Sequence, residues 1–249
     1  MFLEVSTPTY FTQTPTDFTT ESPGPTETPG PDHTTSPPPQ TPTPSTPPPP
    51  TVATTQNTGP TNCYGLIFAG EMSQSITLQE KTNFLNIVLQ IARNFQNTNL
   101  KFAITTFGIK IYQNLNDFQS YNEFVSTVNG LIAGLPLPNS ALTYIAPVLD
   151  DIYDDLILYN GKGISTLFMG EMEAIRDPNA GYTAALRVAS TGKNVYVLDY
   201  SSGSIPASLW PYLTNNHFER IINGTGYDAT TIYNNFYSTL ITDINNNIC

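Results

Sequence analysis

One stretch decides the fold: CYGLIFAGEMSQSI, residues 63–76. Within it, Tyr64–Ala69 is a short apolar run of the kind that forms a strand buried on both faces. The residues that follow alternate an acidic side chain with two hydroxyls, at Glu71, Ser73 and Ser75. A buried strand ending in an oxygen-rich loop is typical of an α/β protein, in which ligands lie beyond the carboxyl ends of the strands.

The rest of the chain repeats this pattern, because apolar runs of strand length alternate with amphipathic stretches of helix length. Such alternation predicts a mostly parallel sheet flanked by helices. The expected strands are Tyr64–Ala69, Lys101–Phe107, Ile109–Leu115, Gly163–Met169, Val195–Asp199 and Phe218–Ile222. The expected helices are Leu78–Phe95, Ser120–Leu131, Thr143–Tyr159, Gly181–Thr191, Ala207–Leu213 and Ala229–Ile244.

One pair of strands should be antiparallel. Only Gly108 separates Lys101–Phe107 from Ile109–Leu115, which is too short for a helical crossover, so one of the two should lie antiparallel at the sheet edge. The predicted fold class is therefore α/β: a doubly wound, mostly parallel six-stranded sheet with one antiparallel edge strand and helices on both faces.

Residues 1–60 differ in composition from the rest. They contain sixteen of the 22 prolines and no Lys or Arg, and they alternate Thr, Ser and Pro. Such a segment lacks the apolar side chains needed to offset the loss of chain entropy on folding. We predict a disordered, mucin-like stalk in residues 1–60, either O-glycosylated or a plain linker, and one folded domain in residues 63–249.

The charge restricts the class of partner. The chain has 9 basic and 20 acidic side chains, which gives a formal net charge of −11. Nucleic acid is excluded as a partner because its phosphates require a basic face. No segment reaches the roughly 20 continuous apolar residues that cross a bilayer, so we expect no membrane span in this sequence.

The two cysteines bracket the predicted domain, since Cys63 is its first residue and Cys249 its last. A disulfide between them would indicate an oxidising compartment and a secreted protein, and two free buried thiols are the alternative. Asn223 begins an N-glycosylation sequon. Met1–Val5 has no basic region and only a short apolar stretch, so we expect either a missing natural N-terminus or a mature or truncated form.

Five side chains could supply oxygen ligands to one site. Glu71, Ser73 and Ser75 alternate after the first strand, Thr143 opens a predicted helix, and Glu171 follows the strand Gly163–Met169. A hard cation such as Mg²⁺ or Ca²⁺ prefers an all-oxygen site. The alternative is that the three hydroxyls cap loops and helices, as Ser and Thr often do.

These residues resemble the von Willebrand factor type A and integrin I-domain family, and the resemblance covers nearly all of residues 63–249. The family's metal-ion-dependent adhesion motif is Asp-x-Ser-x-Ser after the first strand, a Thr at the start of a middle helix, and Thr-Asp-Gly after the fourth strand. Ser73 and Ser75 match the serines and Thr143 matches the threonine. The resemblance implies a cation site at which a partner's acidic side chain completes the coordination, and a disulfide joining the ends of the domain.

Two positions depart from the family motif. Glu71 replaces the first Asp, and Met169-Gly170-Glu171 replaces Thr-Asp-Gly. A carboxylate displaced by one methylene, or by one residue along the loop, meets an octahedral site poorly. We therefore predict a degenerate metal site with weakened affinity, and no cofactor is certain.

Residues for catalysis are scarce. His33 and His217 are the only histidines, which leaves little material for a histidine-dependent mechanism. Gly224–Ala229 resembles a dinucleotide fingerprint, but we interpret it as a turn before a helix capped by Asp228. Four acids on one predicted helix are interpreted as a solvated stripe rather than a calcium site: Asp150, Asp151, Asp154 and Asp155.

The leading hypothesis is a secreted, non-enzymatic adhesion or ligand-recognition module. Its extracellular protein or glycan partners would contact three strand-end loops, Glu71–Ser75, Pro138–Tyr144 and Gly170–Pro178. The alternatives are a structural, mucosal-coat or host-defence protein that works through its stalk and, less favoured, an α/β hydrolase or nucleotide-binding enzyme.

Overall fold

A computed structural model describes residues 62–115, 117–135, 140–202 and 209–249. The predicted stalk and the first residues of the loop Pro138–Tyr144 lie outside the described residues. The strands are β1 Cys63–Glu71, β2 Lys101–Phe107, β3 Ile111–Gln113, β4 Gly163–Gly170, β5 Asn194–Asp199 and β6 Ile221–Asn223. The α-helices are α1 Leu78–Asn94, α2 Tyr121–Ala133, α3 Ala146–Leu158, α4 Pro178–Ser190, α5 Trp210–Leu213, α6 Ala229–Phe236 and α7 Thr242–Asn245.

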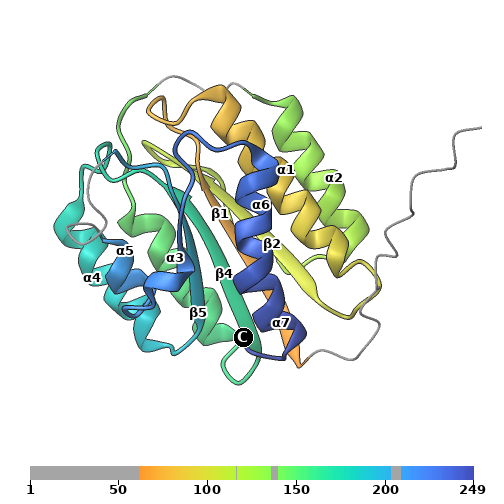
Figure 1. Cartoon of the computed structure of the whole chain (residues 1–249). Helices are drawn as coiled ribbons and strands as arrows, with labels where there is room; N and C mark the ends of the chain where they lie inside the picture. Colours follow the sequence, from red (N-terminus) through yellow and green to blue (C-terminus); the bar gives the residue numbers. More distant parts are fainter. Residues whose placement is uncertain (1–61, 116, 136–139, 203–208) are drawn as a thin grey trace, which may run out of the picture. The chain divides into compact units, whose positions relative to one another are not determined.

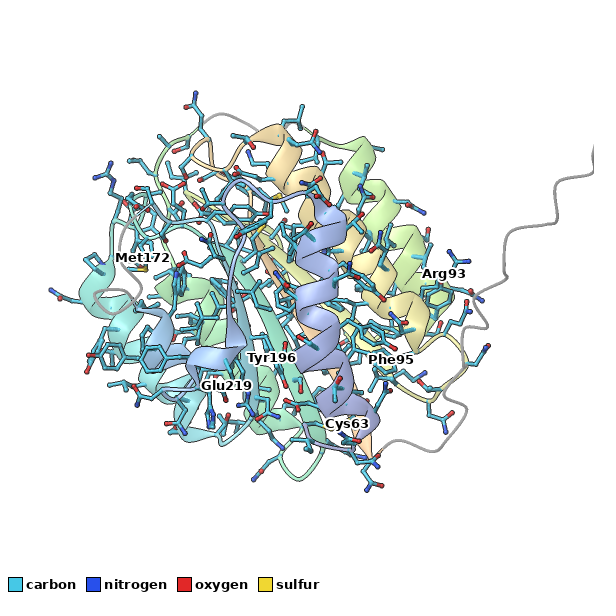
Figure 2. The ribbon with its side chains drawn as sticks, viewed as in Figure 1. Cys63, Arg93, Phe95, Met172, Tyr196 and Glu219 are labelled. Atoms are coloured by element: carbon cyan, nitrogen blue, oxygen red, sulfur yellow. A yellow bond between two sulfur atoms is a disulfide. The ribbon has the colours of Figure 1, made fainter. Side chains whose placement is uncertain are left out.

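The strands form one six-stranded sheet in the order β3-β2-β1-β4-β5-β6. Every neighbouring pair is parallel except β2 and β3, so the predicted antiparallel edge is confirmed. The chain leaves β1 towards β2 and later returns to β4 on the other side of β1, which makes the β1–β4 boundary the switch point of the sheet. Figure 2 marks the two ends of these strands, with Met172 in the loop after β4 and Cys63 at the start of β1.

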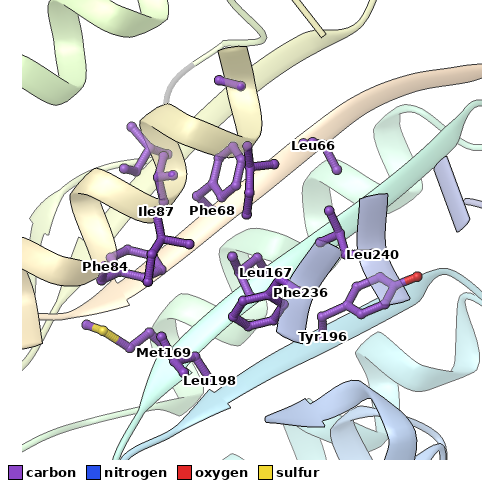
Figure 3. Close-up of a cluster of buried hydrophobic side chains, with 14 of the residues drawn as sticks. Leu66, Phe68, Phe84, Ile87, Leu167, Met169, Tyr196, Leu198, Phe236 and Leu240 are labelled. Atoms are coloured by element: carbon purple, nitrogen blue, oxygen red, sulfur yellow. The ribbon is translucent and has the colours of Figure 1, made fainter. Parts of the chain in front are cut away.

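Helices cover both faces of the sheet (Figure 1). α1, α2, α6 and α7 lie on one face, and α3, α4 and α5 lie on the other. The period-two alternation of β1 divides its side chains between two cores, because Leu66 and Phe68 face the first set of helices whereas Ile67 and Ala69 face the second. Figure 3 shows the first core, in which Phe68 lies near Phe84 of α1.

The predicted start of the third helix is wrong. Thr143 does not open α3 but forms a parallel β-bridge with Ile175, in which its N–H donates to the carbonyl of Ala174 at 3.1 Å. α3 begins at Ala146 because the Asp177 carboxylate accepts the N–H groups of Ile145 and Ala146, each at 2.9 Å. The same Asp177 precedes α4, which begins at Pro178 rather than at the predicted Gly181.

The last strand and the last helix also differ from their predicted bounds. A 3₁₀ turn at Phe218–Arg220 takes up the first residues of the predicted strand, so β6 is limited to Ile221–Asn223. A π-helical turn at Tyr237–Ile241 divides the predicted final helix into α6 and α7. The cap of that helix is confirmed, since an Asp228 carboxylate oxygen accepts the N–H of Thr230 at 2.8 Å.

The predicted disulfide is confirmed. Cys63 and Cys249 are bonded, with their Cα atoms 5.8 Å apart, and among the described residues there is no free cysteine. Cys63 begins β1 and Cys249 follows α7, so the bond joins the ends of the domain at the edge of the sheet where the parallel strands start. Within the described ranges, no helix has the length and apolar character needed to cross a membrane.

The acidic residues on α3 were predicted to form a solvated stripe, but some of them are partly buried. Asp150 pairs with Arg187, and Asp155 is half-buried. Burial raises the pKa of Asp155 to about 6, and the negative charges of Asp117, Asp151 and Asp154 add to the shift. The Asp155 carboxyl group is therefore harder to ionise in the folded protein than in water.

Replacing this side chain tests the cost of its charge. We expect Asp155→Asn to raise the free energy of unfolding by about 1 kcal/mol at about pH 7.5, after allowance for solvent screening. Because the folded-state pKa lies above the ordinary value of 3.8, the wild type loses stability relative to the variant as the pH rises from 3.8 to about 6. Urea unfolding at several pH values measures the difference, and Asp154→Asn, which removes only one of the neighbouring charges from an exposed position, should give a smaller gain. An equal gain at about pH 3 would contradict this explanation.

Candidate functional site

Three segments meet at the switch point of the sheet. Glu71 is the last residue of β1, and Glu171 directly follows β4. Thr143 reaches the same place from the segment before α3, where its bridge to Ile175 fixes its backbone. The structure therefore brings the segments that carry the five predicted ligands to one edge of the sheet.

Glu71 is the centre of the site and is only 1% exposed. Its Oε1 atom accepts hydrogen bonds from the hydroxyls of Ser73 and Thr143, each at 2.5 Å, and a longer one from Ser75 at 3.3 Å. Its Oε2 atom accepts the backbone N–H of Glu171 at 2.8 Å. Oε1 thus has three hydroxyl neighbours and Oε2 has one amide donor, so both oxygens of the carboxylate are hydrogen-bonded.

Burial controls the electrostatics of the site. It raises the pKa of Glu71 above the ordinary range, and the hydrogen bonds from Ser73, Thr143, Glu171 and Ser75 oppose that rise. Burial also raises the pKa of Glu171 to about 7, and the charges of Glu71 and Glu173 act in the same direction. The carboxylates of Glu71 and Glu171 therefore interact unfavourably when both are charged.

Lys81 is a member of the site that the sequence interpretation did not include. Its side chain is buried, and burial lowers its pKa, whereas the negative charges of Glu71 and Glu80 raise it. The ammonium group thus lies within electrostatic reach of Glu71 and compensates part of its charge. The sequence did contain a sign that Lys81 is buried. Lys81 precedes the buried Phe84 and Leu85 by three and four residues, and side chains at these spacings share a helix face.

The arrangement does not fit a bound divalent cation. Adjacent oxygens around Mg²⁺ at about 2.1 Å lie about 3.0 Å apart in an octahedron. Here Ser73 Oγ lies 2.5 Å from both Glu71 Oε1 and Ser75 Oγ, which are hydrogen-bond separations. In the described part of the chain, no three His, Cys, Asp or Glu side chains are grouped so that they could hold a metal ion.

Two further predicted features lie away from the centre of the site. Asn223 is exposed at the end of β6, and its Oδ1 atom accepts the N–H of Thr225 at 2.8 Å. Its glycosylation stays a prediction. His217 precedes β6, at the opposite edge of the sheet, and its Nδ1 atom lies 2.7 Å from Glu219 Oε1.

Comparisons with known proteins place this geometry in context. No protein-family model matches the sequence, and no curated protein matches it. Solved structures do match: proximal thread matrix protein 1 from the mussel byssus, with a zinc-occupied MIDAS motif, is 12% identical with a TM-score of 0.52. That match covers 76% of this chain, and the chain spans 45% of the byssus protein.

Two other matches agree with it. Manganese-loaded Plasmodium vivax TRAP is 13% identical with a TM-score of 0.53, and the match covers 71% of this chain and 73% of that one. A von Willebrand factor type A protein from Catenulispora acidiphila is 11% identical with a TM-score of 0.51, covering 71% and 41% of the two chains. Residues 62–249 thus form a doubly wound α/β domain with a site at its switch point. More particularly, they have the von Willebrand factor type A fold.

Proposed function

We propose that residues 63–249 are an extracellular recognition module that binds a protein or glycan partner through its strand-end loops, with weakened dependence on a divalent cation. The observation that carries this proposal is the convergence of three loops on the buried Glu71 at the switch point. Ligands of doubly wound sheets bind at this position. Two proteins of similar fold bind a metal ion, zinc in a MIDAS motif in one and manganese in the other, which supports a ligand-binding role for this domain.

The surface beside Glu71 has the composition of a binding surface. Ile109 and Tyr144 are 43% and 40% exposed, and the Tyr144 N–H donates to the carbonyl of Gly108 at 2.9 Å, so the two loops are in contact. Exposed aromatic side chains are enriched in protein interfaces, because they bury a large area and lose little conformational entropy. We define this pair, Ile109 and Tyr144, as the apolar rim of the site.

The chemistry of the site supports binding rather than catalysis. Glu71 is enclosed by its four donors, and His217 lies at the far edge of the sheet, so neither is placed to act as a base on a substrate at this edge. The Cys63–Cys249 disulfide supports an oxidising, extracellular location. A structural or mucosal-coat role rests on residues 1–60, which lie outside the described residues, and stays a prediction.

The apolar rim gives a direct test. We expect Ile109→Ala combined with Tyr144→Ala to weaken partner binding at least tenfold, because truncation of an anchor such as Tyr144 typically costs about 2 kcal/mol or more and loss of Ile109 removes further apolar contact. The full chain is coupled to beads, and its binding to a panel of immobilised extracellular-matrix proteins and glycans is measured. Leu158→Ala is the matched control, since Leu158 is 74% exposed at the end of α3, on the opposite edge of the sheet.

The outcomes separate the alternatives clearly. Loss of binding in the rim variant alone supports recognition through the strand-end loops. Equal binding by the rim variant and the wild type contradicts it, and so does an equal loss in the Leu158→Ala control. Measuring the same binding in a buffer with a chelator tests the cation dependence: weakened dependence predicts that most of the binding remains.

A further inference from the structure

We infer that the Glu71 carboxylate occupies the position at which a divalent cation would bind in this fold, and that it keeps such a cation out. One group then holds Ser73, Ser75 and Thr143 together, and the strand-end site is complete without metal. This inference deepens the proposed function, and its bearing on partner recognition rests on that proposal.

The polarity of the hydroxyls is set for an anion. A hydroxyl has a single proton, and both Ser73 and Thr143 donate theirs to Glu71 Oε1. Ser75 is then the donor in its 2.5 Å contact with Ser73, and it shares this one proton with its longer 3.3 Å contact to Glu71 Oε1. A cation would have to use the remaining lone pairs of these oxygens while Glu71 holds their protons. A cation bound by all three oxygens would therefore share the cluster with Oε1, which already lies 2.5 Å from Ser73 and from Thr143.

The space beside β4 is also used by Glu71. A Cβ atom added at Gly170 would lie 3.3 Å from Glu71 Oε2 and 3.1 Å from the Trp210 ring. Gly170 stands at the position where the resemblance places the second Asp of the adhesion motif. The side chain of Glu71, one methylene longer than that of Asp, thus reaches the space that a side chain at position 170 would fill. It can do so because Gly170 has no side chain.

Charge supports the same conclusion. A buried carboxylate needs a compensating positive charge, and Lys81 is buried within electrostatic reach of Glu71. A divalent cation in this position would have Lys81 as a like-charged neighbour. Lys81, on α1, therefore already contributes positive charge near Glu71.

Shortening the acid by one methylene tests the inference. We expect Glu71→Asp to withdraw the carboxylate from the three hydroxyls and to bind Mn²⁺ at least tenfold more tightly than the wild type, as ligand repositioning alters metal affinity by about 10- to 100-fold. Calorimetric titration of the full chain with MnCl₂ measures this. The double variant Glu71→Asp, Ser73→Ala is the matched control and should lose the gain, because it lacks one hydroxyl ligand.

Two results would overturn the inference. One is saturable Mn²⁺ binding by the wild type that Ser73→Ala abolishes, and the other is a folded Glu71→Asp protein that binds Mn²⁺ no better than the wild type. Circular dichroism establishes whether Glu71→Asp is folded. If it is not, the wild type and Ser73→Ala titrations decide alone, and absence of a Ser73-dependent signal in them supports the inference. The rim variants are not used in this experiment, so failure of the proposed function is a separate result.

Discussion

Replacing both Cys63 and Cys249 with serine is expected to lower the free energy of unfolding by about 2 to 5 kcal/mol. The bond spans 186 residues, so it restricts the unfolded chain strongly. It also attaches the start of β1 to the end of α7, where chain ends would otherwise fray. Urea unfolding of the full chain, followed by circular dichroism, measures the difference.

Reducing the disulfide of the wild-type protein provides the control for this prediction. Dithiothreitol should shift the unfolding midpoint of the wild type to that of the double serine variant and leave the variant unchanged. A variant with the wild-type midpoint would show that the disulfide contributes nothing to stability.

Phe68→Ala is expected to destabilise the domain by about 3 to 5 kcal/mol, the usual cost of removing a buried phenylalanine. Phe68 lies in the middle of the central strand β1 and is fully buried, and its ring centroid is 5.4 Å from that of Phe124. The substitution would leave a cavity in the core cluster that Phe68 forms with Phe84 and Ile87 of α1, which Figure 3 labels, and with Phe124 of α2. Urea unfolding compares the variant with Leu158→Ala, whose side chain is exposed. A loss below about 1 kcal/mol would mean that the core collapses to fill the space.

The regular parts of the fold follow from the sequence because their patterns are local. The apolar run of β1 and the helical spacing of α1 predict their elements directly, and the single residue between two strands predicts the antiparallel edge. The sequence also indicated that Ser73, Ser75 and Thr143 lie close together, and the structure places their hydroxyls around Glu71, whereas their role as metal ligands stays a prediction.

The remaining features depend on contacts between distant residues. The start of α3 is set by Asp177, which lies 32 residues beyond Ile145, so the pattern around Thr143 could not reveal it. The raised pKa of Asp155 depends on its burial and on the charge of Asp117, which lies on another segment. The orientation of Glu71 was also beyond sequence reasoning, because it results from hydroxyl donors on two loops and an amide on a third.

The position of the disulfide has a mechanical consequence. β1 begins at Cys63 and ends at Glu71, and it is hydrogen-bonded along its length to β2 on one side and β4 on the other. A pull between Cys63 and a partner held at the strand-end loops would act along the axis of β1. Both ladders would then be sheared, and their hydrogen bonds would have to break together rather than one after another. Resistance to such tension is governed by the unfolding rate, so we expect a pull along β1 to unfold the domain more slowly than a pull that opens the two ladders one hydrogen bond at a time.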